Sequence, residues 1–130
     1  MTTAAAMTAP PVTVMLTSTI AEAAAAMREA NASMLPVVDG ASTLLLKGVL
    51  TDRDIIERCV SAQHAPGCLV RDHMTESPLE TAAPTDEIEI VVKRMDTARV
   101  NRLPVVAPDG RVLGVITRRD VTTRALTEAQ

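Results

Sequence analysis

Residues 48–54 read GVLTDRD and residues 114–120 read GVITRRD. The two heptapeptides agree at every position except the third and the fifth, and each places threonine three residues before aspartate. Such self-similarity is the first feature to settle in a sequence, because it reveals a duplicated structural unit. The chain therefore predicts two copies of one small fold.

The repeat extends upstream of the heptapeptides. The tetrapeptide LPVV at 35–38 recurs at 103–106, and the segment that joins it to the heptapeptide has nine residues in the first copy and seven in the second. A length difference is tolerated best in a surface turn. A fainter match, MTAPP at 7–11 and MTESP at 74–78, precedes the two copies.

Each copy predicts the element order β-α-β-β-α. A short extended stretch (12–16 or 79–83) leads into a helix with a repeated apolar face, and Ser18 or Asp86 is a competent cap near its start. The strand LPVV, a turn, a second strand (44–50 or 111–116) and a second helix follow. The expected apolar helix positions are 20, 23, 24, 27, 55, 56, 59 and 60 in the first copy, and 88, 91, 92, 95, 121, 125 and 126 in the second.

One copy alone, of about 55 residues, is too small to bury its sheet well. We therefore expect a fold of the α/β (α+β) class, in which two repeats pack through their sheets about a pseudo-two-fold axis. The expected divisions are an N-terminal tail at 1–9, a first repeat at 10–63, a linker at 64–73, a second repeat at 74–126 and a C-terminal tail at 127–130.

Composition narrows the class of protein. A hydrophobic content of 47% favours a folded core, and a net charge of −3 without a basic stripe argues against nucleic acid as a partner. No apolar run approaches a membrane span, and the N-terminus lacks the features of a signal peptide. We therefore expect a cytoplasmic location, no membrane partner, and free thiols at Cys59 and Cys68.

The repeated threonine and aspartate suit a sugar phosphate. Each threonine ends a strand where a helix begins, so the unpaired amides and the positive end of the helix dipole favour a phosphate there. The aspartate in the first turn can accept hydrogen bonds from both ribose hydroxyls, and the arginine before it can neutralise phosphate. The residues concerned are Thr51, Arg53, Asp54, Thr117, Arg119 and Asp120.

The same pattern has a purely structural interpretation, which the residues leave open. Threonine followed by aspartate is ordinary helix capping and needs no ligand, and the arginines can be solvated surface charges. His64 and His73 would need convergent ligands from elsewhere to bind a metal, and no Gly-rich phosphate loop or Ser-His-Asp order is present. Neither a metal site nor an enzyme is predicted.

The duplicated LPVV, turn and G-V-x-T-x-R-D pattern, each copy preceded by an Ile…Met helix, resembles a tandem pair of cystathionine-β-synthase (CBS) domains, or Bateman module. The resemblance covers roughly residues 7–126. It implies a regulatory module without catalytic activity, many of whose relatives bind AMP, ADP, ATP or S-adenosylmethionine in the clefts between the repeats. The resemblance implies that no cofactor is required and that an adenine nucleotide is the regulatory ligand.

The resemblance also implies further ligand contacts. The residue before LPVV is a frequent phosphate contact in the family, and it is Arg102 in the second copy but Met34 in the first. The first extended stretch would face the base, which gives Thr13, Val14, Thr81 and Ala82. We therefore expect unequal sites, with tighter phosphate binding in the second copy. The alternatives are an interaction module without a small ligand, and an S-adenosylmethionine binder.

The stretch AEAAAAM at 21–27 bears on assembly. A helix there carries small apolar residues on almost every face, which suits burial on two sides, although alanine is also chosen for helix propensity alone. The resemblance implies homodimers with helices at the contact. We expect a homodimer formed through helices that include residues 20–28, and an unknown protein partner regulated in trans.

Overall fold

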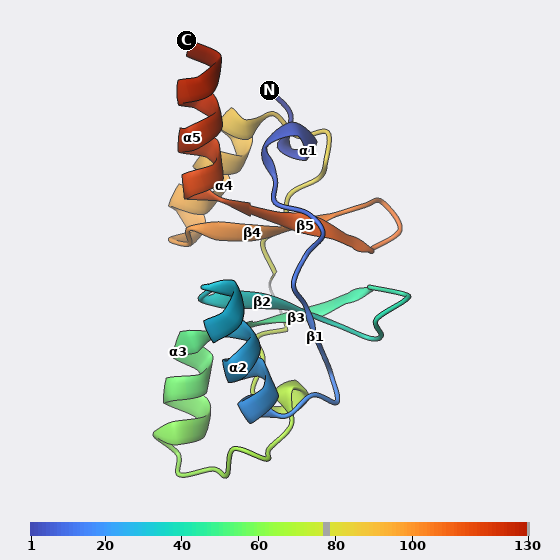
Figure 1. Ribbon diagram of the computed structural model, residues 1–130, viewed down its shortest axis with the longest axis vertical. Helices are drawn as coiled ribbons and strands as arrows, with labels where there is room; N and C mark the ends of the chain where they lie inside the picture. The colour runs from blue at the N-terminus through green and yellow to red at the C-terminus, as the bar shows by residue number, and fades with distance from the viewer. Residues whose placement is uncertain (77–78, 130) are drawn as a thin grey trace. The chain divides into compact units, whose positions relative to one another are not determined.

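The computed structural model describes the backbone of residues 1–76 and 79–129 (Figure 1). Side chains are described for residues 1–76 and 79–123. The chain forms two compact units. The first-repeat unit is Val12–Leu79, and the second-repeat unit combines Met1–Pro11 with the chain from Glu80 onward. Both contain helices and sheet, so the expected mixed α+β class with two repeats is confirmed.

The first-repeat unit is built on a three-stranded sheet in the order β1-β2-β3. Strand β1 (Val14–Met15) runs parallel to β2 (Met34–Val38), which pairs antiparallel with β3 (Leu46–Thr51). The helical segments are α2 (Ile20–Ala30), α3 (Asp52–Asp54) with its π-helical continuation Ile55–Val60, and a 3₁₀ turn at Val70–Asp72.

The second-repeat unit repeats this arrangement. Its antiparallel pair is β4 (Arg102–Val106) and β5 (Val112–Thr117), and Ala82 adds a parallel bridge to Val105 where β1 stands in the other unit. The helices are α1 (Thr3–Ala6), α4 (Ile88–Ala98) and α5 (Arg118–Ala129). Among the described residues, no helix has the length and apolarity that a membrane span requires.

The cap of α2 lies one residue later than expected. Thr19 occupies the N-cap position, its hydroxyl accepts the amide of Glu22, and the Glu22 carboxylate accepts the amide of Thr19 in return. Ser18 instead accepts the amide of Met15, so the extended stretch turns before the helix begins. In α4 the N-cap position is likewise Glu87, and Asp86 accepts the amide of Ala83.

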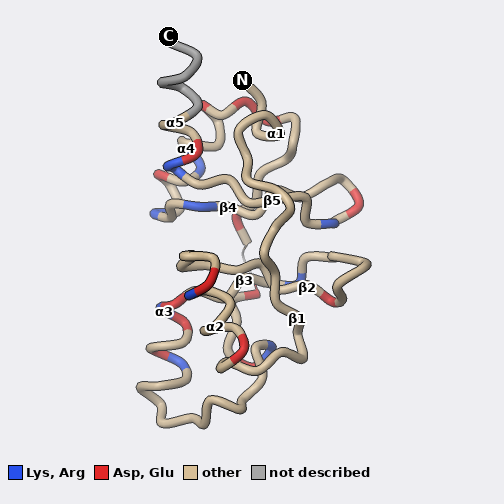
Figure 2. Tube along the Cα trace, in the orientation of Figure 1, with Lys and Arg blue, Asp and Glu red and all other residues tan. Residues whose placement is uncertain are grey.

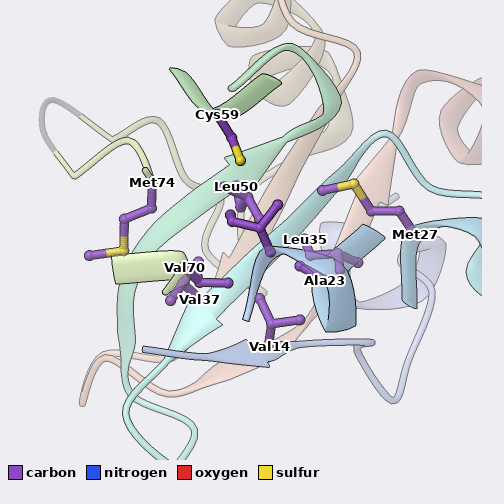
Figure 3. Close-up of a cluster of buried hydrophobic side chains, with 10 residues drawn as sticks. Val14, Ala23, Met27, Leu35, Val37, Leu50, Cys59, Val70 and Met74 are labelled. Carbon is purple, nitrogen blue, oxygen red and sulfur yellow. The ribbon is translucent and has the colours of Figure 1, made fainter. Parts of the chain in front are cut away.

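Each unit has its own aliphatic core. In the first, the predicted helix positions Ile20, Ala23 and Met27 pack with Leu35 and other sheet residues, several of which Figure 3 labels. In the second, the equivalent residues are buried in the same way. The expectation was wrong at positions 24, 56 and 60, which are exposed, because only one side of each of these helices meets the sheet. Val121 packs against the second core, and the side chains at 125 and 126 lie outside those described.

The expected tail and linker are parts of the two units. Thr8 forms a bridge with Val115, and Thr75 forms the equivalent bridge with Val49. The fainter sequence match at 7–11 and 74–78 therefore marks two short segments that cross the sheets, although 77–78 lie outside the described residues. The units consequently begin and end at other positions than the repeat boundaries expected from sequence.

These crossing segments explain the first residue of each heptapeptide. A Cβ built on Gly48 would lie 2.7 Å from the Thr75 carbonyl oxygen, and one on Gly114 would lie 2.6 Å from that of Thr8. Any side chain at either position would collide with backbone. Glycine is therefore required here by close approach of the backbone.

Candidate functional site

The first strand-to-helix junction is a complete capping box. Thr51 ends β3, and its hydroxyl accepts the amide of Asp54 at 3.0 Å. The Asp54 carboxylate accepts the amide of Thr51, also at 3.0 Å. Asp54 is 8% exposed, and its Oδ1 forms an ion pair with Arg58 Nε at 3.7 Å. The structural role expected for this motif is thus present in full.

The second junction has the same geometry with a more open aspartate. The Thr117 hydroxyl accepts the amide of Asp120 at 2.9 Å, and the Asp120 carboxylate accepts the amide of Thr117 at 3.1 Å. Asp120 is half-buried, whereas Asp54 is buried. A carboxylate offers about four lone-pair directions, so each aspartate keeps acceptor capacity for a ligand hydroxyl, and Asp120 is the more accessible.

Each aspartate has a further partner that sequence reasoning missed. The Thr8 hydroxyl donates to both oxygens of Asp120 at 3.2 Å, and the Thr75 hydroxyl donates to those of Asp54 at 3.3 and 3.4 Å. The signal was the MT dipeptide that begins both upstream matches. Thr8 and Thr75 fix the orientation of the carboxylates, so they belong to the candidate site.

The two junctions differ in what surrounds the first helical turn. At the first, the Asp52 amide donates to the Ser33 carbonyl and the Asp52 carboxylate accepts the Arg53 amide at 2.8 Å. This carboxylate therefore already satisfies an amide of the first helical turn that would otherwise be open to an anion. Helix α3 is also only three residues long before it becomes π-helical. The first junction is therefore poorly suited to an anion.

At the second junction, Arg118 stands where the first has Asp52. Its guanidinium turns away to Asp96 at 2.8 Å and Asn101 at 3.1 Å, and its amide donates to the Asn101 carbonyl. The Arg119 amide thus lacks the carboxylate that caps its counterpart. Because α5 is a twelve-residue helix, its N-terminus carries the partial positive charge that favours an anion.

The arginines expected to contact phosphate behave differently from one another. The Arg53 side chain is 81% exposed and bonded to Glu57 at 2.8 Å, and this hydrogen bond raises the pKa of Arg53. Arg119 is exposed. Arg102 lies directly opposite Thr117 in the β4–β5 pair, so the two side chains leave the same face of the sheet. Figure 2 shows basic and acidic residues gathered at the starts of β4 and α5.

Arg102 carries an unsatisfied donor. Its Nε is buried, and among the described residues no acceptor lies within hydrogen-bond range of it. A buried charged donor without a partner is costly, so such a group calls for an acceptor. In the first repeat the equivalent position is Met34, which lies opposite Thr51 and has no side-chain hydrogen-bond donor to satisfy.

The residues expected to face a base lie on the first extended stretches. Val14 and Ala82 are buried in the two cores, and both backbone polar groups of Ala82 pair with β4. Thr13 and Thr81 are partly exposed, and the Thr81 carbonyl accepts from Arg94 at 2.6 Å. No hydrogen bond between the described residues joins these four to the junctions, so their ligand role stays a prediction.

The comparisons with known proteins agree with the duplicated fold. The model of the CBS domain family matches residues 4–61 and 70–126. The inosine-5'-monophosphate dehydrogenase of Streptococcus pyogenes is 32% identical over 102 residues, which are 78% of this chain and 20% of the enzyme. The chain therefore spans about a fifth of the length of the curated dehydrogenases that it matches first.

Three solved structures share the whole fold. CBSX2 in complex with AMP is 28% identical with a TM-score of 0.82, and the match covers 99% of this chain and 98% of that one. The CBS domain pair of protein MJ0100 with 5-methylthioadenosine and S-adenosyl-L-methionine is 25% identical with a TM-score of 0.84, over 100% and 98%. Hypoxic Response Protein I with two coordinated zinc ions is 26% identical with a TM-score of 0.83, over 95% and 98%. With both repeats matched by the family, this chain belongs to the CBS domain family and carries two CBS domains.

Proposed function

We propose that this protein is a regulatory, non-catalytic module that binds an adenosine phosphate at the Thr117–Asp120 junction. The observation that carries the proposal is the buried, unpartnered Nε of Arg102, whose residue lies opposite Thr117 in the sheet. The complex of a 28% identical CBS protein with AMP supports the same class of ligand.

Each group at the junction has a distinct role. The phosphate takes the N-terminus of α5, where the Arg119 amide and the Thr117 hydroxyl can donate and the Arg102 guanidinium supplies charge. Asp120, held by Thr8, accepts the ribose hydroxyls. The aliphatic side chains of this chain, which has no Phe, Tyr or Trp, hold the base without stacking.

We propose one dominant phosphate site rather than two. The first junction has Met34 in place of Arg102, and Asp52 already satisfies an amide of the first turn of α3. Thr51, Arg53 and Asp54 would therefore bind an anion much more weakly.

Calorimetric titration of nucleotide-free protein with AMP, ADP and ATP tests this assignment. Arg102→Met, which copies the first repeat, should weaken AMP binding at least tenfold, about 1.4 kcal/mol. Arg111→Gln removes an exposed charge from the same unit and should leave the affinity unchanged. Wild-type affinity in Arg102→Met would refute the phosphate assignment.

S-adenosylmethionine is the alternative ligand, supported by the complex of the MJ0100 domain pair. It has no phosphate, so it cannot make the phosphate contact assigned to Arg102. If Arg102→Met leaves or raises the affinity for S-adenosylmethionine while AMP fails to bind wild type, that ligand replaces AMP in the proposal. Absence of binding to all four compounds favours an interaction module without a small ligand.

We propose that the output acts in trans, through a homodimer and an unidentified protein partner. On α2, Ala21, Ala24 and Ala25 are exposed in the isolated chain, which leaves a face of small residues for a second copy. Sedimentation equilibrium should give a dimer, and Ala24→Arg should yield monomers that retain the helical circular dichroism. A monomeric wild type would refute the dimer. The cytoplasmic location stays a prediction from sequence.

A further inference from the structure

We infer that His64, Cys68 and His73 form a binding site for one zinc-type metal ion. One nitrogen of each histidine and the cysteine sulfur all lie within 4.8 Å of one another. His64 Nδ1 and His73 Nε2 are 3.0 Å apart. All three residues belong to the first-repeat unit, and none takes part in the phosphate site proposed above.

The orientation of His73 leaves a lone pair directed into the cluster. Its Nδ1 lies 2.9 Å from the Leu69 carbonyl oxygen, which can only accept, so Nδ1 carries the hydrogen. In the neutral ring Nε2 is then free to coordinate, and it is the atom that faces His64. A hydrogen bond from the second ring nitrogen to a carbonyl is the usual support of a metal-binding histidine.

The spacing of the donor atoms is close to that of a tetrahedral site. Bond lengths of about 2.0 Å for Zn–N and 2.3 Å for Zn–S imply separations of roughly 3.3 Å between two nitrogens and 3.5 Å between nitrogen and sulfur. The two histidine nitrogens, at 3.0 Å, need to part only slightly. The sulfur, within 4.8 Å, needs to approach by roughly an ångström.

The backbone that carries these side chains is firmly held. The Cys68 carbonyl accepts the amide of Ile20 at 2.8 Å, and the His64 amide donates to the Cys59 carbonyl at 2.8 Å. The His73 amide donates to the Val70 carbonyl at 2.9 Å. The backbone of the three residues is therefore ordered before an ion binds, which lowers the ordering cost of binding.

The second-repeat unit shows that the fold does not need a histidine here. Met1 accepts the amide of Ile88 as Cys68 accepts that of Ile20, and Thr8 pairs with β5 as Thr75 pairs with β3. The segments 1–8 and 68–75 are thus equivalent, and the counterpart of His73 is Ala6, 2% exposed. His73 is 3% exposed, so the first unit buries a polar ring where an alanine suffices.

The donor set selects the class of metal. Two imidazoles and a thiolate suit Zn²⁺, and they do not suit Mg²⁺ or Ca²⁺, which prefer oxygen. Three protein ligands leave the fourth tetrahedral position for water or an added ligand. His64 is exposed, so an ion can enter from solvent. Because Met1 and Ala6 occupy the equivalent places, the other unit lacks these donors and one ion per chain is expected.

Cobalt titration of untagged, chelator-treated protein tests the site. Wild type should bind one equivalent of Co²⁺, with visible bands of tetrahedral geometry and a thiolate-to-cobalt charge-transfer band in the near ultraviolet. The latter band is easily seen, because the chain has no Phe, Tyr or Trp. Zn²⁺ should displace the cobalt and abolish both features.

Three variants separate this site from other binding. Cys68→Ser should remove the charge-transfer band, and His64→Ala, at an exposed residue, should weaken Co²⁺ and Zn²⁺ binding at least tenfold with the circular dichroism intact. Cys59→Ala removes the other thiol and should retain the wild-type spectrum. Failure of wild type to bind equimolar Co²⁺ would overturn the proposal, as would a wild-type spectrum and affinity in both Cys68→Ser and His64→Ala.

Discussion

The hydroxyl of Thr75 donates to both carboxylate oxygens of Asp54, although the two residues are 21 positions apart. The contact joins the segment that follows the first repeat to the helix that the heptapeptide begins. Thr8 makes the equivalent contact with Asp120 from the other end of the chain. The aspartate of each heptapeptide is thus oriented both by its own capping threonine and by a distant one.

We predict that Thr75→Val destabilises the protein by about 1–2 kcal/mol, because a buried carboxylate loses a donor while the side-chain shape is kept. Thr8→Val should cost less, since Asp120 is half-exposed and water replaces the lost partner. Urea denaturation followed by circular dichroism measures both, and a larger loss for Thr8→Val would contradict the burial argument.

Gly48→Ala and Gly114→Ala should each destabilise by at least about 1–3 kcal/mol, because the new Cβ collides with the Thr75 or Thr8 carbonyl oxygen and the strand must shift. Gly67→Ala is the matched control, since a Cβ there meets no atom within 4 Å. It should be neutral or slightly stabilising in thermal denaturation. Equal losses in all three variants would show that the close approach is not the cause.

Thr19→Ala should cost about 1 kcal/mol, because α2 loses its capping hydroxyl. Glu22→Ala removes the reciprocal half of the box, and the double variant should cost less than the sum of the two. Thr17→Ala, at an exposed residue just before the cap, serves as the control. Additive losses for Thr19 and Glu22 would mean that the two side chains do not act as a box.

Acid should remove a stabilising contribution from Asp86. The hydrogen bond from the Ala83 amide, with one from Arg94, holds the pKa of this carboxyl below its ordinary value of 3.8. A pKa that is lower in the folded chain favours folding above the ordinary value, and this advantage is lost as the pH falls through the folded value.

Asp86→Asn should therefore melt at a lower temperature than wild type at neutral pH, and the difference should shrink as the pH falls below 3.8 and through the lowered pKa of Asp86. Thermal scans by circular dichroism across this range measure it, with the exposed Glu80→Gln as the control. A difference between wild type and Asp86→Asn that persists unchanged at pH 2 would exclude the proposed cause.

Much of the fold could be predicted from the sequence, because the repeat places the same apolar positions in the same order twice. The LPVV strands and the residues at 20, 23 and 27 are buried as their periodicity indicates. The cap was wrong by one residue because Ser18 and Thr19 are equally competent, and only the turn made by Met15 decides between them. Periodicity likewise cannot say which unit an extended segment joins, so residues 1–9 were expected to be a tail, whereas Met1–Pro11 belongs to the second-repeat unit.

Less of the candidate site could be predicted. The capping geometry of Thr51 with Asp54 follows from their spacing, but Asp52 capping the Arg53 amide depends on side-chain rotamers. The cluster of His64, Cys68 and His73 has no standard metal-binding spacing, and its members converge because the loop turns back onto the start of α2. Long-range contacts of this kind leave no periodic trace in a sequence.

The division of the chain between its two units sets an order of events during synthesis on the ribosome. Val12–Leu79 is one unbroken stretch, so everything that the first-repeat unit needs has been synthesised before translation of residues 80 onward begins. The other unit is made from the two ends of the chain. Thr8 is synthesised more than 100 residues before Val115, so its bridge to β5 cannot form until Val115 leaves the exit tunnel.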